Sequence, residues 1–215
     1  MRKTATYNTI VINLFGGPGS GKTTCALEIT SELRKRRIEA EFVGEVAKEL
    51  IYDGKEKLLD GSFVNELSIL TEKFRRINRM YGQVDAIVTD APIKQSIIYA
   101  KEGLNTLQMI TNSLSQKFNN LNLFVERGNR EYQNRGRIHS YEESLKIDLE
   151  LKKYLKSNRV NFIPVQYSDI STIVKAINTD SSDFYEDIFH ALCKNCKQHP
   201  EDEIKDEKTD ENEDE

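Results

Sequence analysis

A glycine-rich segment at residues 16–24 carries the residue types and spacing that bind phosphate groups. Its sequence, GGPGSGKTT, contains the pattern G-x-x-x-x-G-K-[ST]. Small residues let backbone N–H groups close around phosphate oxygens, Lys22 places a cation between the terminal phosphates, and the Thr23 hydroxyl can bind Mg²⁺. The predicted phosphate site consists of Gly16, Gly17, Pro18, Gly19, Ser20, Gly21, Lys22, Thr23 and Thr24.

The segments on either side supply the context that this motif requires. Residues 9–15 (TIVINLF) are β-branched and apolar enough for a buried strand. Residues 23–36 carry apolar residues at helical spacing. Strand, loop and helix in this order aim the positive end of a helix dipole at the bound phosphates.

Asp90 ends a second apolar run, residues 84–89 (VDAIVT), and is followed by Ala91 and Pro92. Because proline cannot continue a strand ladder, we expect Asp90 at the carboxyl tip of this strand. Thr23 and Asp90 are therefore the predicted ligands of Mg²⁺; the alternative is an aspartate that caps the following turn. Ala91 stands where motor and remodelling ATPases carry a second, water-activating acid, which argues against that class. An N-K-x-D element for guanine is absent as well.

Glu45 is a second candidate carboxylate. It follows a predicted strand at residues 38–44 and opens a helical pattern at 45–50. Since α/β proteins bind ligands beyond the carboxyl ends of their strands, Glu45 is expected across the site from Lys22. There it can take a proton from a substrate hydroxyl or bind a sugar or base. The alternative is a helix N-terminal charge that complements the dipole.

An arginine-rich polar segment separates the strand predicted at 121–126 from a helix that a Ser140-x-x-Glu143 capping box begins. We predict a lid at about residues 127–140, because arginines over the site can neutralise charge that develops during phosphoryl transfer. A solvated surface would explain the same charges. The arginines of this segment are Arg127, Arg130, Arg135 and Arg137.

The remaining pattern alternates strands with helices. Further helices are predicted at 63–77 after a Ser62 cap, at 94–101, 104–118, 140–156 and 170–177, and a last strand at 161–166. Such alternation predicts an α/β fold in which helices cover both faces of a parallel sheet.

These motifs together resemble a known family. GGPGSGKTT, FVGEVAKEL, VTDAP and R-x2-R-x-Y-x3-G-R are similar to AAA-type ATP-binding proteins that resemble the ribosylnicotinamide kinase domain, many of them encoded by phages. That group lies in the P-loop NTPase superfamily, near the compact nucleoside and nucleoside-monophosphate kinases. The resemblance implies a three-layer fold with a five-stranded parallel sheet, an arginine-rich lid, ATP as phosphate donor and Mg²⁺ as cofactor. Related nucleoside kinases often carry an arginine where Ala91 stands, so the acceptor stays open.

Composition predicts a single domain with a tail. The net charge is −4, but residues 201–215 hold ten acidic residues and two lysines, which leaves residues 1–200 with +4. We expect a kinase-like domain at 1–180, a C-terminal helix at 181–199 and a disordered acidic tail at 200–215. The basic balance is weak evidence for nucleic acid, and no signal peptide or membrane span is visible, so a cytoplasmic protein is expected.

His190, Cys193, Cys196 and His199 recur every three residues near the end of the chain. Structural zinc sites usually separate two ligand pairs by a dozen or more residues. The spacing therefore favours an amphipathic helix over a zinc site, and metal analysis would decide between them.

The leading hypothesis is transfer of the γ-phosphoryl group of ATP to a nucleoside, a nucleotide or a related small molecule. Lys22 and the loop amides would hold the phosphates, and Glu45 would orient or deprotonate the acceptor. The alternative is an ATPase or nucleotide-dependent switch that acts on a protein or nucleic-acid partner.

Overall fold

The computed structural model describes residues 8–128 and 138–166. Several predicted features lie outside these residues. They are the lid arginines Arg130, Arg135 and Arg137, the helix at 170–177, the His/Cys cluster and the acidic tail.

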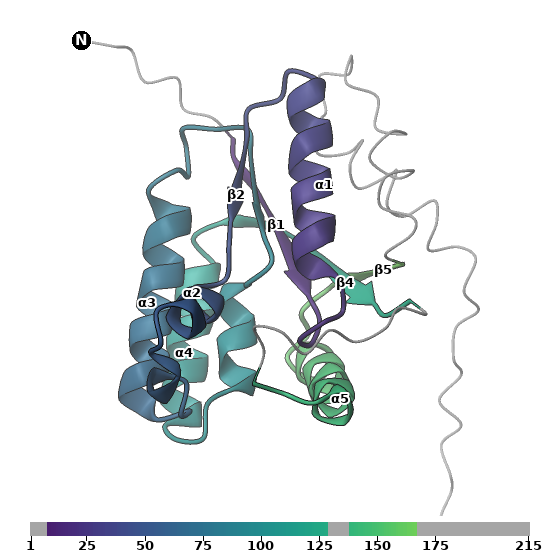
Figure 1. Cartoon of the computed structure of the whole chain (residues 1–215). Helices are drawn as coiled ribbons and strands as arrows, with labels where there is room; N and C mark the ends of the chain where they lie inside the picture. Colours follow the sequence, from purple (N-terminus) through teal and green to yellow (C-terminus); the bar gives the residue numbers. More distant parts are fainter. Residues whose placement is uncertain (1–7, 129–137, 167–215) are drawn as a thin grey trace, which may run out of the picture.

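A five-stranded parallel sheet forms the centre of the molecule, as predicted (Figure 1). Its order is β2-β3-β1-β4-β5, and every neighbouring pair is parallel. The strands are β1 (Ile10–Phe15), β2 (Ala40–Val43), β3 (Ala86–Thr89), β4 (Asn119–Glu126) and β5 (Ile163–Gln166). Pro164 is compatible with strand structure because β5 is an edge strand.

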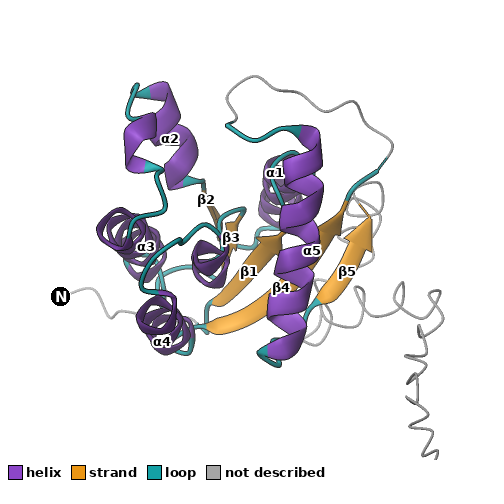
Figure 2. Cartoon of the chain, turned by 90° about the horizontal axis from the view of Figure 1, so that it is seen from below, coloured by secondary structure: helices purple, strands orange, loops and turns teal. Residues whose placement is uncertain are grey.

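Helices cover both faces of this sheet. The α-helices are α1 (Lys22–Lys35), α2 (Val46–Tyr52), α3 (Phe63–Asn78), α4 (Leu104–Ser115) and α5 (Tyr141–Ser157). Two 3₁₀ turns, η1 (Glu56–Leu58) and η2 (Ile93–Ile98), complete the described elements. α1 packs on one face of the sheet, whereas α3, α4 and α5 pack on the other. Figure 2 shows α3 and α4 to the left on that face and α5 in front of β4.

Alternate side chains of β1 divide the core into two parts. Ile10, Ile12 and Leu14 pack in a cluster with buried residues of α1. Val11 packs instead with residues of α3, η2 and α4. A strand buried on both faces needs a near-continuous apolar run, and IVINLF is such a run.

The parallel topology brings three chain segments to one edge of the sheet. In the register, Thr89 of β3 lies opposite both Asn13 of β1 and Val43 of β2. The loop after β1, Glu45 after β2 and Asp90 after β3 therefore emerge at the same carboxyl edge, where α/β sheets bind ligands.

The helix signals in the sequence are largely confirmed. Ser140 and Glu143 make both hydrogen bonds of the capping box. Ser62 is the N-cap residue of α3, but its side chain makes no capping hydrogen bond. The segment predicted as a helix at 94–101 is instead the 3₁₀ turn η2, which is short and follows Pro92 directly.

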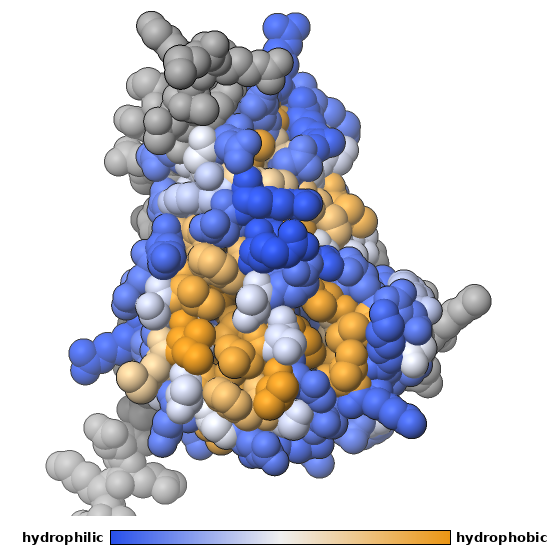
Figure 3. Space-filling view, turned by 90° about the vertical axis from the view of Figure 1, so that its left-hand side faces the viewer, coloured by the Kyte–Doolittle hydropathy of each residue, from blue (hydrophilic) through white to orange (hydrophobic). Residues whose placement is uncertain are grey.

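Apolar side chains are also found on the outer surface. Figure 3, which shows the left-hand side of Figure 1, reveals apolar patches in its lower half, with less apolar and hydrophilic side chains between and around them. Val64 of α3 and Met109 of α4 are more than two-thirds exposed. Exposed apolar residues form a large share of any folded surface, and we assign no role to them. None of the described helices is long and apolar enough to cross a bilayer.

Candidate functional site

The loop after β1 folds as the phosphate-binding motif requires. Gly16 has a φ of 144°, which disfavours any other residue. Lys22 is the first residue of α1, is 7% exposed, and its ammonium donates a 2.8 Å hydrogen bond to the Gly17 carbonyl. The hydroxyl oxygen of Ser20 is buried without a hydrogen-bond partner among the described residues. Such an unsatisfied group in a loop of this kind suits a phosphate oxygen.

The ammonium of Lys22 lies in a buried environment that disfavours its charge. Burial lowers its pKa, while the nearby charges of Glu45, Asp90 and Asp148 act in the opposite direction. Bound phosphate would add negative charge at the same place. The loop therefore favours the binding of an anion, which would stabilise the charged form of Lys22.

Asp90 lies directly beyond β3, as predicted, and is 3% exposed. One carboxylate oxygen accepts a 2.5 Å hydrogen bond from the Thr23 hydroxyl, and the other is buried without a partner among the described residues. Burial raises the pKa of Asp90, the Thr23 bond opposes this, and Glu45 adds to it. A carboxylate and a hydroxyl are ligands that Mg²⁺ prefers.

These two side chains fit a magnesium ion held jointly with a nucleotide. Among the described residues, no group of three or more His, Cys, Asp or Glu side chains could hold a metal by itself. Mg²⁺ commonly binds one or two protein ligands together with phosphate oxygens and water. The unpartnered oxygen of Asp90 fits that arrangement.

A clamp from α5 holds the back of the phosphate-binding loop. Asp148 accepts hydrogen bonds from the Gly17 backbone N–H and from Arg127, with which it forms an ion pair. Arg127 also donates to the carbonyls of Pro18 (2.8 Å) and Ser144 (3.2 Å). Arg127, predicted for the lid, is thus bound to the loop, and its catalytic role stays a prediction.

The same clamp explains why residue 17 is glycine. A Cβ atom there would lie 2.6 Å from the Ser144 carbonyl oxygen and 2.9 Å from the Asp148 carboxylate. Neither group can retreat easily, since one is helix backbone and the other is fixed by Arg127. The motif tolerates any residue at this position, but the tertiary packing does not.

Replacing Asp148 with asparagine should loosen the loop. The amide has one acceptor oxygen where the carboxylate has two, and Arg127 loses its counter-charge. We expect about tenfold weaker ATP binding and a melting temperature lower by about 4 °C. Asp85→Asn is the matched control, because Asp85 also accepts a backbone N–H, from Glu39, but at the opposite end of the sheet. Equal ATP affinity in the two variants would show that α5 does not support the loop.

A large cleft opens beside the loop. It has a volume of about 870 Å³ and lies between α2 and α3 on one side and α5 on the other, the arrangement seen in Figure 2. Pro18, Gly19, Gly21, Lys22, Thr23 and Thr24 form its loop wall. Gly16, Gly17 and Ser20 lie beneath that wall and are buried. The volume is in the range of small-molecule and cofactor sites.

Glu45 faces this cleft together with Lys22. It is the N-cap residue of α2, yet its side chain makes no capping hydrogen bond. No capping hydrogen bond holds the carboxylate, although its position at the helix N-terminus also suits the alternative, a charge that complements the dipole. It can act on a molecule in the cleft.

The sequence analysis missed two charged residues in the cleft wall. Glu66 and Lys73 of α3 both line it, and both are less than 7% exposed. They alternate with Leu70 and Ile77 at intervals of four, three and four residues, which is the stripe that a helix normally buries with apolar side chains. Charged residues in a stripe that is normally apolar can therefore indicate a ligand site from the sequence alone.

Lys73, Ser96 and Tyr99 place polar groups in or next to the wall of the cleft. Its ammonium donates a 2.9 Å hydrogen bond to the Ser96 hydroxyl. Burial lowers its pKa, and the charges of Glu45, Glu66 and Asp90 oppose this. Nearby, Tyr99 lines the cleft, and burial raises the pKa of its phenol well above 10. At neutral pH Tyr99 is therefore a neutral hydroxyl.

Glu66 should make the stability of the protein depend on pH. Burial raises its pKa above the ordinary 4.5, Lys73 opposes this, and Asp60 adds to it. Because the folded state then binds the proton more tightly, the contribution of Glu66 to stability is greatest below pH 4.5 and is lost as pH rises through the folded pKa. Glu66→Gln should remove this decline, as urea unfolding from pH 4 to 8 would measure. A wild-type-to-variant difference that does not change with pH would contradict the assignment.

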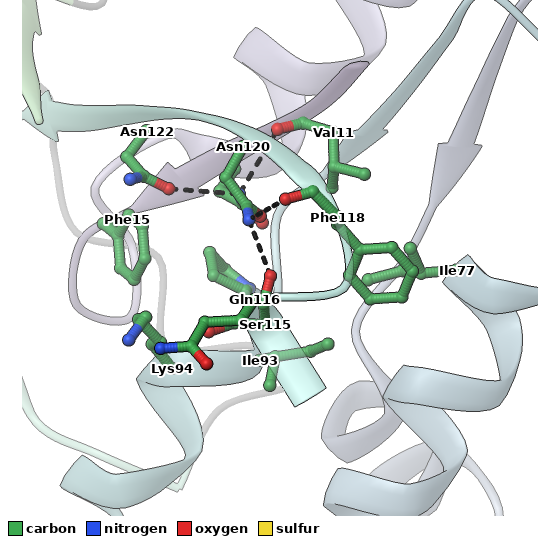
Figure 4. A pocket seen from close by; sticks show the side chains of 12 residues that line it. Val11, Phe15, Ile77, Ile93, Lys94, Ser115, Gln116, Phe118, Asn120 and Asn122 are labelled. Atoms are coloured by element: carbon green, nitrogen blue, oxygen red, sulfur yellow. Dashed lines mark hydrogen bonds between the residues drawn. The ribbon is translucent and has the colours of Figure 1, made fainter. Parts of the chain in front are cut away.

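A second, smaller cavity lies against the face of β1 that packs on α3, η2 and α4. It has a volume of about 140 Å³ and is lined by residues of β1, β4, α3, η2, α4 and the turn after α4 (Figure 4). Asn13 donates to the side chains of Asn120 (2.9 Å) and Asn122 (3.1 Å), and Asn120 donates to the backbone carbonyls of Ser115 and Phe118. The amides are thus used in joining β1 to the turn before β4. The volume is below the range of nucleotide-sized pockets.

Comparisons with known proteins identify a family and a fold. The model of a family described as AAA domain matches residues 11–172. No curated protein sequence matches the chain. A solved structure of deoxyadenosine kinase from M. mycoides with bound dATP is 17% identical, covers 77% of this chain and 95% of its own, and has a TM-score of 0.53.

A second structure of deoxyadenosine kinase from M. mycoides, with the products dCMP and a flexible dCDP bound, is also similar. It is 15% identical, covers 87% of this chain and 98% of its own, and has a TM-score of 0.47. At such identities, the likeness to the dATP-bound structure shows a shared fold.

Proposed function

The chain belongs to the AAA domain family and is a P-loop NTPase with a nucleoside-kinase-like fold, and on this basis we propose that it is an ATP-dependent kinase. The reaction proposed is transfer of the γ-phosphoryl group of ATP to a nucleoside, a nucleotide or a related small molecule. One observation carries the proposal: the phosphate loop and the acidic residue Glu45 face the same cleft of about 870 Å³. A donor and an acceptor could therefore bind side by side.

In this proposal the loop holds the donor. Lys22 and the loop amides bind the phosphates, and the buried Ser20 hydroxyl donates to a phosphate oxygen. Thr23 and Asp90 would hold Mg²⁺, which when bound neutralises phosphate charge. The clamp of Asp148 and Arg127 keeps the loop in the binding conformation.

The opposite wall receives the acceptor. Glu45 orients an acceptor hydroxyl and accepts its proton as the oxygen attacks the γ-phosphorus. The bond from that phosphorus to the β–γ bridging oxygen breaks, and ADP leaves. Arg130, Arg135 and Arg137 are proposed to close over the transferring group. Closure would exclude water and so favour transfer over hydrolysis.

A direct transfer assay tests the proposal. The purified full-length protein is incubated with γ-labelled ATP, Mg²⁺ and a panel of nucleosides and nucleoside monophosphates. Label that appears on an acceptor supports the kinase. Only slow release of free phosphate, stimulated by a protein or a nucleic acid, would instead support an ATPase or switch.

A further inference from the structure

We propose that Glu66 selects the acceptor by accepting a hydrogen bond from an exocyclic amine of a nucleobase. This inference deepens the proposed kinase function and rests on it for the identity of the cleft as an acceptor site. It concerns recognition only, because Glu66 lies on a different helix from the residues that would act on the reacting atoms.

Glu66 is a buried carboxylate that nothing in the described structure satisfies. The residue is 4% exposed, and no hydrogen bond or ion pair to its carboxylate exists among residues 8–128 and 138–166. It lines the cleft, and its oxygens are not among the fully enclosed unpartnered atoms. Its carboxylate therefore opens into the cleft.

A carboxylate in this position carries a free-energy cost in the absence of a ligand. Burial disfavours its charged form, as the raised pKa of Glu66 indicates. A hydrogen-bond donor on a bound molecule would remove that cost. Proteins tolerate unsatisfied buried polar groups mainly where such groups serve a function.

Neighbouring charges restrict the chemistry of the ligand at this end. Lys73 is bound to Ser96, and its charge is balanced by Glu45, Glu66 and Asp90. Lys48, Lys101 and Lys146 also line the cleft, so the wall as a whole is not acidic. What a ligand meets at this end is the Glu66 carboxylate, which has no partner among the described residues. A phosphate or carboxylate would be repelled by Glu66, whereas an amine donor would be attracted.

The spacing along α3 matches a molecule with two ends. Lys73 is electrostatically coupled to Glu45, Glu66 and Asp90, so it lies between the proposed reacting groups and Glu66, which is seven residues earlier on the same helix. Seven residues correspond to about 10 Å along the helix axis, on the scale of a nucleoside. Ile69 lies between the two charges, and with Leu59 and Ile98 it provides apolar surface in the cleft for a flat ring.

Matched nucleoside pairs test this inference. Adenosine differs from purine riboside, and guanosine from inosine, only by an exocyclic amine. Binding of each is measured by calorimetric titration of the full chain with a non-hydrolysable ATP analogue and Mg²⁺ present. We expect the wild type to bind the amine-bearing member of at least one pair about tenfold or more tightly.

Glu66→Gln keeps one acceptor oxygen but loses the charge that strengthens the hydrogen bond, and its amide can turn an N–H₂ donor toward the ligand. It should therefore bring that ratio to within about threefold of unity. Glu72→Gln is the control on the same helix, because Glu72 pairs with Arg75 and Arg76 outside the cleft. Glu66→Asp, which keeps the charge but withdraws it by one methylene, should give an intermediate ratio. An unchanged ratio in Glu66→Gln, or no amine preference in the wild type, would overturn the inference.

The proposed kinase function is tested separately from the inference, by measuring phosphate transfer as well as binding. Glu66-dependent binding without transfer of phosphate would support the inference and refute the proposed function. Transfer of phosphate that Glu66→Gln does not change would support the proposed function and refute the inference. If Glu66→Gln fails to fold, as judged by circular dichroism, the ratio for Glu66→Asp decides, and a value equal to that of the wild type overturns the inference.

Discussion

Replacing Lys22 with alanine is expected to lower kcat/KM for phosphoryl transfer by about 10³-fold. The ammonium lies inside the loop, is 7% exposed, and is held at the Gly17 carbonyl. No other cation of the described loop wall can take its place, since Lys22 is the one lysine or arginine of residues 16–24. Transfer assays at saturating acceptor would measure the loss.

Stability measurements separate a functional loss from an unfolded protein. Burial disfavours the charge of Lys22, so its removal should leave the melting temperature of the ligand-free protein unchanged or higher. Lys35→Ala, at the exposed end of the same helix, is the control and should retain full activity. Wild-type turnover in Lys22→Ala would exclude the loop as the donor site.

Replacing Glu45 with glutamine is the second large effect expected. The amide cannot accept a proton, so kcat should fall by about 10²- to 10⁴-fold if Glu45 is the base. ATP affinity should stay within about twofold of the wild type, because Glu45 is assigned to the acceptor wall and not to the loop. Turnover and ATP binding are measured on the same preparation.

Glu49→Gln is the matched control for this variant. Glu49 lies one turn further along α2 and pairs with Arg76, away from the cleft. It should retain activity while Glu45→Gln loses it. If Glu45→Gln loses no transfer activity, the acceptor-side role of Glu45 is wrong, although the donor loop would stand.

Local signals were sufficient to predict most of the fold. The apolar run of β1, the capping box of α5 and the Pro92 that ends β3 each act within a few residues, so their effects can be recognised without a structure. One prediction was wrong. The sequence pattern predicts an α-helix at residues 94–101, but the structure has the 3₁₀ turn η2 at residues 93–98. Packing against α3 and α4 stabilises that turn.

Non-local contacts account for what could not be predicted about the site. The hydrogen bond from Gly17 to Asp148 joins residues 131 positions apart. The sequence predicts the helix at 63–77 but assigns no role to Glu66 or Lys73, because the spacing of residues along a helix does not show which of them meet a ligand. Only the position of α3 beside the cleft shows that these two charges face a ligand-sized space.

The sequence by itself determined the phosphate loop, the parallel sheet and the placement of Glu45 and Asp90 at strand ends. These follow from backbone geometry and apolar periodicity, which are local or repeat regularly. The tertiary structure alone decided the clamp on Gly17, the extent of the cleft and the exposure of Glu66 to it. Those features depend on how α3 and α5 approach the loop from distant parts of the chain, and side-chain packing sets that approach.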